Sequence, residues 1–99
     1  MTFTNSEKKL LQEIIKLEDK YPENSTLNVF VIDEIKNLVM YYNSGIEQAF
    51  AIQNSMSTLH REICAYPNLC RLKRDNAKLE KLKHVLESKL GKGELHGKF

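Results

Sequence analysis

The stretch YYNSGIEQAF, residues 41–50, most constrains this chain's fold, because it decides between one long helix and two helices joined by a turn. Asn43, Ser44 and Gly45 follow an apolar segment, and glycine is preferred just past a helix C-terminus because it adopts positive φ without strain. Ser44 and Glu47 have the S-x-x-E spacing of a capping box, which marks a helix start. Glycine inside a continuous helix would cost roughly 1 kcal/mol relative to alanine. We therefore expect a tight turn here; the alternative is one long, kinked helix that would favour a self-associating rod.

The N-terminal segment carries the start and stop signals of an amphipathic helix. Thr4 and Glu7 form a T-x-x-E capping box, and leucine and isoleucine residues then recur at helical spacing. Pro22 disfavours helical backbone at the residue before it, so the helix should end there. Asn24 or Ser25 can cap the next helix, since short polar side chains accept hydrogen bonds from its first free N–H groups.

The next segment, TLNVFVIDEIKNLVMYY (residues 26–42), is the most apolar part of the chain. Its β-branched residues would suit a strand, but no other segment offers a strand partner for its backbone. Five of its apolar residues instead follow a helical spacing: Leu27, Val31, Ile35, Leu38 and Tyr42. Val29, Phe30, Ile32 and Val39 widen this apolar face, so we expect this helix to be the most buried one.

Two further helices are expected in the C-terminal half. The third covers residues 46–65, and its apolar stripe extends to Tyr66 before a proline ends it. The fourth ends at Leu90. It begins either near Asn68 or at Asp75, because the polar residue Asp75 interrupts its leucine stripe and could act as an N-cap.

These elements predict an all-α fold, an antiparallel four-helix bundle with a flexible C-terminal tail. Residues 1–90 should form the single bundle domain, and residues 91–99, which hold three glycines, should form the tail. With 99 residues, 41% of them hydrophobic, the chain can bury one core but leaves little room for a deep cavity.

Charge is unevenly distributed along the chain. Residues 1–49 hold five lysines and eight acids, a balance of −3, whereas residues 50–99 hold ten basic residues and five acids, a balance of +5. A basic C-terminal half can meet an acidic partner or form a solvated helix face. No apolar run approaches the roughly 20 residues of a transmembrane helix, and the N-terminus lacks a signal-peptide pattern. We therefore expect a cytoplasmic protein.

Catalytic motifs are scarce. His60 and Cys64 lie one helical turn apart, which is the spacing of a base and a nucleophile, or of two zinc ligands in a set that Cys70 and His84 would complete. However, these gaps differ from common zinc modules, and no glycine-rich loop or orienting third group accompanies the pair. We predict a non-enzyme with no catalytic residue, cofactor or metal, and two reduced cysteines.

The run RLKRDNAKLEKLKH, residues 71–84, is basic enough to contact phosphates. Leucines interleave at core spacing, acids dilute the charge, and no aromatic residue offers a stacking surface for bases. Nucleic acid is therefore not the expected partner. The alternative function that the run leaves open is a small helical adaptor or regulator, such as a phage-encoded one, that binds a protein or nucleic acid through its basic last helix.

The segment KLEKLKHVLESKLGKG, Lys78–Gly93, is similar to the ending of class IIa (pediocin-like) bacteriocin immunity proteins of the enterocin A immunity type. The expected architecture resembles that family over most of the chain. The resemblance implies a non-enzymatic protein, cytoplasmic and peripheral to the inner face of the membrane, that protects a producing Gram-positive bacterium from a pore-forming peptide. Protection would act at the cytoplasmic side of the receptor, a membrane sugar permease with bound bacteriocin.

The same resemblance implies that specificity lies in the C-terminal half, in residues that contact a protein partner. The residues we select as partner contacts are Lys83, Lys89, Lys92, Leu95, His96, Lys98 and Phe99. The protein is expected to be a monomer or a weak dimer.

Overall fold

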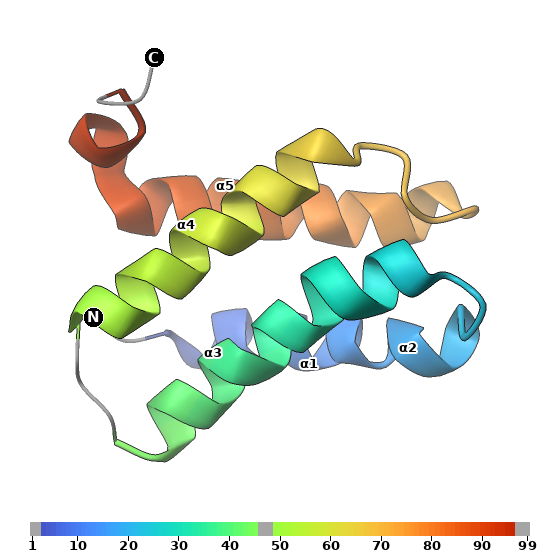
Figure 1. Cartoon of the computed structure of the whole chain (residues 1–99), viewed down its shortest axis with the longest axis horizontal. Helices are drawn as coiled ribbons and strands as arrows, with labels where there is room; N and C mark the ends of the chain where they lie inside the picture. Colours follow the sequence, from blue (N-terminus) through green and yellow to red (C-terminus); the bar gives the residue numbers. More distant parts are fainter. Residues whose placement is uncertain (1–2, 46–48, 97–99) are drawn as a thin grey trace.

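The computed structural model describes residues 3–45 and 49–96, and all regular secondary structure within these ranges is helical (Figure 1). In chain order the elements are α1 (Asn5–Ile15), α2 (Leu17–Lys20), η1 (Leu27–Ile32), α3 (Asp33–Asn43), α4 (Ala49–Ala65) and α5 (Lys73–His96). The expected all-α class is thereby confirmed for the described part of the chain.

The longer helices form a bundle-like packing around one core. Helix α1 lies against α3 and α5, and α4 lies against the same two helices. Figure 1 shows the resulting two layers, with α3 and α4 in front and α1 and α5 behind. Core side chains with no exposed surface come from every layer and include Leu11, Ile14, Val31, Ile35, Met56, Leu59 and Leu86.

Two of the predicted helix caps are present. The Thr4 hydroxyl accepts a hydrogen bond from the Glu7 N–H at 3.2 Å, and the Thr4 N–H donates to the Glu7 carboxylate at 2.8 Å. These reciprocal bonds confirm the capping box at the start of α1. The Asn24 side chain accepts a hydrogen bond from the Leu27 N–H at 3.0 Å, which confirms it as a cap of the following helix.

The helix ends before Gly45, as predicted. Helix α3 ends at Asn43, and Gly45 has a φ of 65°, in the left-handed region that glycine adopts without strain. The N–H of Ser44 donates to the Met40 carbonyl at 3.0 Å and closes the last turn of α3. The second predicted capping box involves Glu47, which lies outside the described residues.

The most apolar segment is helical, as expected, but its first part, η1, is a π-helix. Four residues of the predicted arc, Leu27, Val31, Ile35 and Leu38, are buried, and the fifth, Tyr42, is partly buried. Of the residues predicted to widen the buried face, Ile32 is buried and Val39 packs against the core in part. The prediction is wrong for Val29 and Phe30, whose side chains are 55% and 47% exposed. At helical spacing both residues fall outside that arc, on a side of the helix that faces solvent.

Helix α5 begins at Lys73, so neither predicted start, Asn68 or Asp75, is correct. Asp75 is not an N-cap; it lies in the first turn and has no exposed surface. Its carboxylate Oδ2 accepts a hydrogen bond from the Tyr21 hydroxyl at 2.6 Å and lies 2.7 Å from Nζ of Lys20. The Asp75 carboxylate can be buried because Lys20, at the end of α2, and Tyr21, directly after it, supply a positive charge and a hydrogen bond. An N-cap at the surface would lack both partners.

At its other end α5 continues to His96, past the predicted end at Leu90. Gly91 interrupts it with non-helical backbone angles, φ 78° and ψ 159°. The predicted boundary between domain and tail thus coincides with a break in the helix. Residues 97–99 lie outside the described part of the chain.

Asp75→Asn should lower the free energy of unfolding by about 1–3 kcal/mol, because Lys20 and the Tyr21 hydroxyl lose their ionised acceptor in a buried site. Urea unfolding followed by circular dichroism measures this loss. Asp33→Asn, an exposed aspartate in α3, is the matched control and should change stability little.

The same pair of proteins tests the ionisation of Asp75. Burial raises the pKa of Asp75, but hydrogen bonds from Lys20 and Tyr21 outweigh burial and hold the pKa below its ordinary value of 3.8. Stability from this carboxylate is therefore complete above the ordinary pKa and is lost as the pH falls through the lowered value. Asp75→Asn should flatten the loss of stability below about pH 4; an unchanged acid profile in the variant would contradict this assignment.

Candidate interaction surface

Val29 and Phe30 lie within η1 and Tyr66 directly follows α4; these three apolar side chains are partly exposed, and we call them the aromatic patch. The rings of Phe30 and Tyr66 stack, with centroids 6.5 Å apart and planes 15° apart, although 47% and 38% of the two residues are exposed. Pro67 ends α4 here. The Tyr66 N–H donates to the Ile63 carbonyl, three residues earlier, at 3.3 Å, which is the hydrogen-bond spacing of a 3₁₀ turn. The prediction that Tyr66 continues the buried stripe of α4 is thus wrong.

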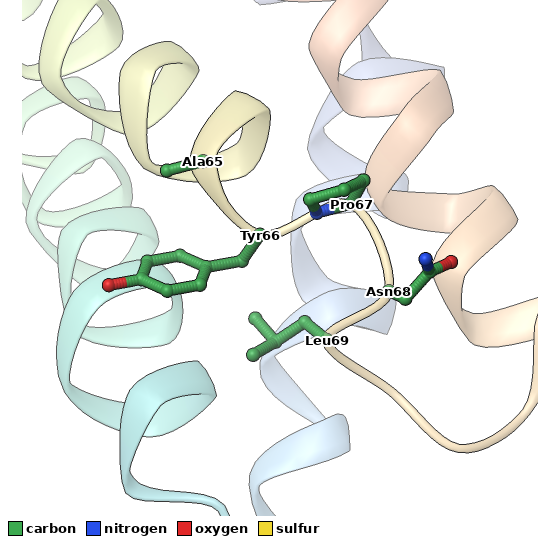
Figure 2. A pocket seen from close by; sticks show the side chains of 5 residues that line it. All are labelled: Ala65, Tyr66, Pro67, Asn68 and Leu69. Carbon is green, nitrogen blue, oxygen red and sulfur yellow. The ribbon is translucent and has the colours of Figure 1, made fainter.

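An open hollow of about 310 Å³ adjoins the aromatic patch. It is lined by five consecutive residues, Ala65, Tyr66, Pro67, Asn68 and Leu69. Figure 2 shows the Tyr66 ring reaching from the end of α4 toward the helix that η1 begins, with Leu69 below it and Asn68 pointing away. The hollow is wide open to solvent, so it suits a protruding side chain of another molecule better than an enclosed small ligand.

Two asparagine side chains hold the connection between α4 and α5 (residues 66–72). Nδ2 of Asn24 donates to the Leu69 carbonyl at 2.9 Å. Asn76 accepts a hydrogen bond from the Cys70 N–H at 2.9 Å and donates to the Cys70 carbonyl at 2.7 Å. These bonds satisfy backbone groups that no helix satisfies, so the connection has one defined conformation and the hollow is formed in advance.

The residues after the hollow are basic. Arg71, Lys73 and Arg74 are all exposed. Arg71 lies 3.0 Å from Glu23 and 5.0 Å above the Tyr21 ring, whereas Lys73 and Arg74 have no ion-pair partner among residues 3–45 and 49–96. The connection that follows Tyr66 therefore leads into positive charge, at Lys73 and Arg74, that the described residues do not neutralise.

A separate polar cluster joins α4 to α5. Nε2 of His60 lies 2.9 Å from one carboxylate oxygen of Glu87, and Nδ1 of His84 lies 3.3 Å from the other. The His60 contact contributes most to a pKa of Glu87 below its ordinary value, against the opposing effect of burial. Sγ of Cys64 lies 3.7 Å from Nε2 of His60. Glu87 is thus the third group beside the His–Cys pair that sequence reasoning missed, because its approach depends on how α5 packs against α4.

The thiol in this cluster is a weak nucleophile. Burial raises the pKa of Cys64 above its ordinary value of 9.0; Lys83 opposes the increase and Glu87 adds to it. The protonated thiol therefore predominates at neutral pH, whereas the thiolate is the reactive form. Burial also raises the pKa of Cys70, and both cysteines are free thiols, as expected.

Two further properties of the described residues bear on function. Among the residues whose side chains the structure describes, no three histidine, cysteine, aspartate or glutamate side chains come together in a way that could hold a metal ion. None of the helices in residues 3–45 and 49–96 combines the length and apolar character that a bilayer-spanning helix requires.

The structure describes the side chains of two predicted partner contacts. Nζ of Lys83 lies 3.4 Å from the Glu80 carboxylate, one turn earlier on α5. Lys89 is only 14% exposed at its side chain; its Nζ lies 2.9 Å from the Glu7 carboxylate and 4.9 Å above the Phe3 ring. Lys89 therefore fastens α5 to α1.

The other predicted contacts lie at the C-terminal end. Lys92, Leu95 and His96 belong to the part of α5 beyond Gly91, where the structure describes the backbone. Lys98 and Phe99 lie outside the described residues. The structure thus groups three of these positions in one segment beyond the helix break.

Comparison with known proteins finds no relative. No protein-family model matches the chain, and neither a curated protein nor a solved structure matches it. What the chain does must therefore be inferred from its own residues.

Lys89→Met should lower the free energy of unfolding by about 1 kcal/mol, because the variant keeps the apolar stem over Phe3 but loses the partly buried ion pair with Glu7. Thermal or urea unfolding measures the effect. Lys81→Met, which removes an exposed cation from the same helix, is the matched control. Equal stability of the two variants would show that the Glu7 pair adds nothing.

Proposed function

We propose that this chain is a non-enzymatic binding protein that works as the bacteriocin immunity proteins do, and that it folds as an antiparallel four-helix bundle. In this proposal it resides in the cytoplasm, peripheral to the inner face of the membrane. There it protects the producing cell from a pore-forming peptide by binding the peptide's receptor, a sugar permease, from the cytoplasmic side.

The observation that carries this proposal is the break at Gly91. Its φ of 78° turns the chain at the end of the packed part of α5, and Figure 1 shows the last helical turn departing from the line of the helix. A Cβ at Gly91 would meet nothing within 4 Å, so the backbone conformation and not crowding calls for glycine. A C-terminal segment directed away from the helix axis can reach a partner without disturbing the core.

Charge also supports a partner at the membrane. Residues 50–99 carry a net charge of +5, and Lys92 and Lys98 belong to the C-terminal segment, residues 91–99. The inner face of a bacterial membrane is negatively charged, so a cationic segment is attracted to receptors in that plane. Residues 1–49 carry a net charge of −3, so the membrane repels this half of the chain and attracts the other half. This difference would orient the molecule relative to the membrane.

Deletion of residues 91–99 should abolish protection while leaving the fold intact, because Leu90 is the last buried core residue among those described. The test expresses the full and shortened chains in a bacteriocin-sensitive Gram-positive host and measures survival against a panel of pediocin-like peptides. Circular dichroism of the purified proteins confirms that the shortened chain still unfolds cooperatively.

Two glycine variants provide the matched comparison. Gly91→Ala strains a positive φ and should redirect the C-terminal segment, whereas Gly45→Ala strains a similar φ of 65° in equally open space elsewhere. Protection should fall with the first variant and persist with the second. Full protection by the shortened chain would remove the C-terminal segment from the mechanism, and no protection by the full chain against any peptide would refute the proposal.

The alternative function is a small helical adaptor or regulator that binds nucleic acid or a protein through α5. The exposed cations Lys73 and Arg74 favour it, whereas Arg71, Lys78 and Lys83 are already paired with acids. Under this alternative, the full chain should retain duplex DNA or RNA at low salt and release it steeply as salt rises. Absence of retention at low salt would exclude the nucleic-acid version.

A further inference from the structure

We propose that the aromatic patch and the adjoining hollow dock an acidic, amphipathic segment of a protein partner. This surface lies at the Lys73 end of α5, and the C-terminal segment lies beyond Gly91. At 1.5 Å per residue, the helix between them is about 27 Å long. The inference is therefore separate from the proposed function and does not depend on it.

The apolar part of this surface has the character of an interaction site. Phe30 and Tyr66 place two large apolar side chains next to each other in solvent, and Val29, the neighbour of Phe30 in η1, is also exposed. Phe30 and Tyr66 already stack on each other, so a partner need not order them on binding. Aromatic anchors that are rigid before binding commonly contribute most of the energy of an interface.

The hollow defines the kind of contact. Its walls are held by the bonds from Asn24 to Leu69 and from Asn76 to Cys70, so it does not collapse when empty. A volume of about 310 Å³ accommodates one or two apolar side chains of a partner. Side chains that protrude at i and i+4 from a partner helix would fit beside the stacked rings.

The charge beside the hollow indicates the sign of the charge on the partner. The stretch from Tyr66 to Arg74 contains three cations and no acid, and one of these cations, Arg71, is paired with Glu23. Asp75 comes next, but it is buried against Lys20 and does not neutralise the exposed Lys73 and Arg74. A partner segment with acidic residues beside its apolar anchors therefore complements this side of the surface.

The opposite side of the surface carries acids. Asp33 and Glu34 lie on the turn after Phe30, and Glu62 lies on the turn before Tyr66. These carboxylates would repel acidic residues placed over them, so the acids of the partner must lie over the start of α5. They would also repel an anionic lipid surface, because a flat membrane would contact the acidic side and the basic side of this surface at the same time.

The size of the surface favours a segment over a second copy of this chain. A stable dimer commonly buries about 800 Å² on each partner. The aromatic patch consists of three partly exposed side chains around one hollow, which matches the footprint of a short peptide.

Synthetic peptides test the proposal with the full chain. The probe is a fluorescein-labelled helical peptide with two leucine anchors at i and i+4 and glutamates on one flank. Its two matched relatives carry alanine at the anchors or lysine in place of the glutamates. Fluorescence anisotropy should show binding of the first peptide alone, and binding should weaken as salt rises. No binding of the first peptide, or equal binding of all three, overturns the proposal.

Variants of the chain locate the site. Phe30→Ser and Arg74→Glu should each weaken binding about tenfold, the contribution of one anchor or one well-placed charge. Phe50→Ser removes an aromatic residue that is 82% exposed on α4, and Lys81→Glu reverses an exposed charge farther along α5; both should bind as the original chain does. Equal losses in test and control variants would contradict the assigned surface.

Two further measurements separate other occupants. If a second copy of the chain occupies the surface, sedimentation at increasing concentration should show a dimer, and Phe30→Ser should abolish it. Flotation with vesicles that contain phosphatidylserine should show Phe30-dependent binding only if a membrane occupies it. Either result overturns the acidic segment as the occupant.

Discussion

The hydrogen bond between Tyr21 and Asp75 is the interaction on which one end of the molecule depends. A carboxylate with no exposed surface is costly unless charge and hydrogen bonds compensate it, and here Lys20 and Tyr21 supply both. The Tyr21 hydroxyl also lies 3.4 Å from the Leu72 N–H, from which it accepts. Burial, followed by the hydrogen bond to Asp75, raises the pKa of Tyr21, so the hydroxyl remains a donor. The end of α2 is thereby tied to the start of α5.

The position of the α4–α5 connection follows from this tie. Leu69 and Cys70 are held by asparagines on either side of it, one before η1 and one in the first turn of α5. Networks of this kind are rigid when satisfied and costly when a member is lost. The second carboxylate oxygen of Asp75 has no hydrogen-bond partner among the described residues; Nζ of Lys78 lies 3.8 Å away. The surface built from Tyr66 and the hollow thus owes its shape to buried polar groups rather than to its own apolar residues.

Predictions from the sequence succeeded where the interacting groups are close together in the chain. The Thr4–Glu7 capping box and the break at Gly45 depend on a few residues each, and local patterns describe them well. Asp75 looked like a cap because it interrupts a leucine stripe, but its partner Tyr21 is 54 residues away, and periodicity carries no information about that pairing. Glu87 was missed for the same reason, since its approach to His60 spans 27 residues and two helices.

The candidate site shows a related difference. Apolar spacing predicts Phe30 and Tyr66 on the buried faces of their helices, but both are partly exposed. The position of Phe30 outside the arc of Leu27 and Val31 is visible in the spacing. Lys89 is a predicted partner contact because the family resemblance implies that specificity lies in the C-terminal half, and its ion pair with Glu7 cannot be seen from either helix alone.

The packing of α1 against α5 has a consequence for how the chain folds during synthesis. The first helix buries part of its apolar face on the last one, and Glu7 pairs with Lys89 near the two ends of the described chain. Domains that depend on such distant contacts close only after the last segment has left the ribosome, because loop closure must precede the contacts that stabilise it. Until α5 emerges, the apolar faces of α1, α3 and α4 lack one side of their core. A chaperone that shields nascent apolar helices would therefore act on this protein before its final helix appears, and the nascent chain is most prone to aggregation in that interval.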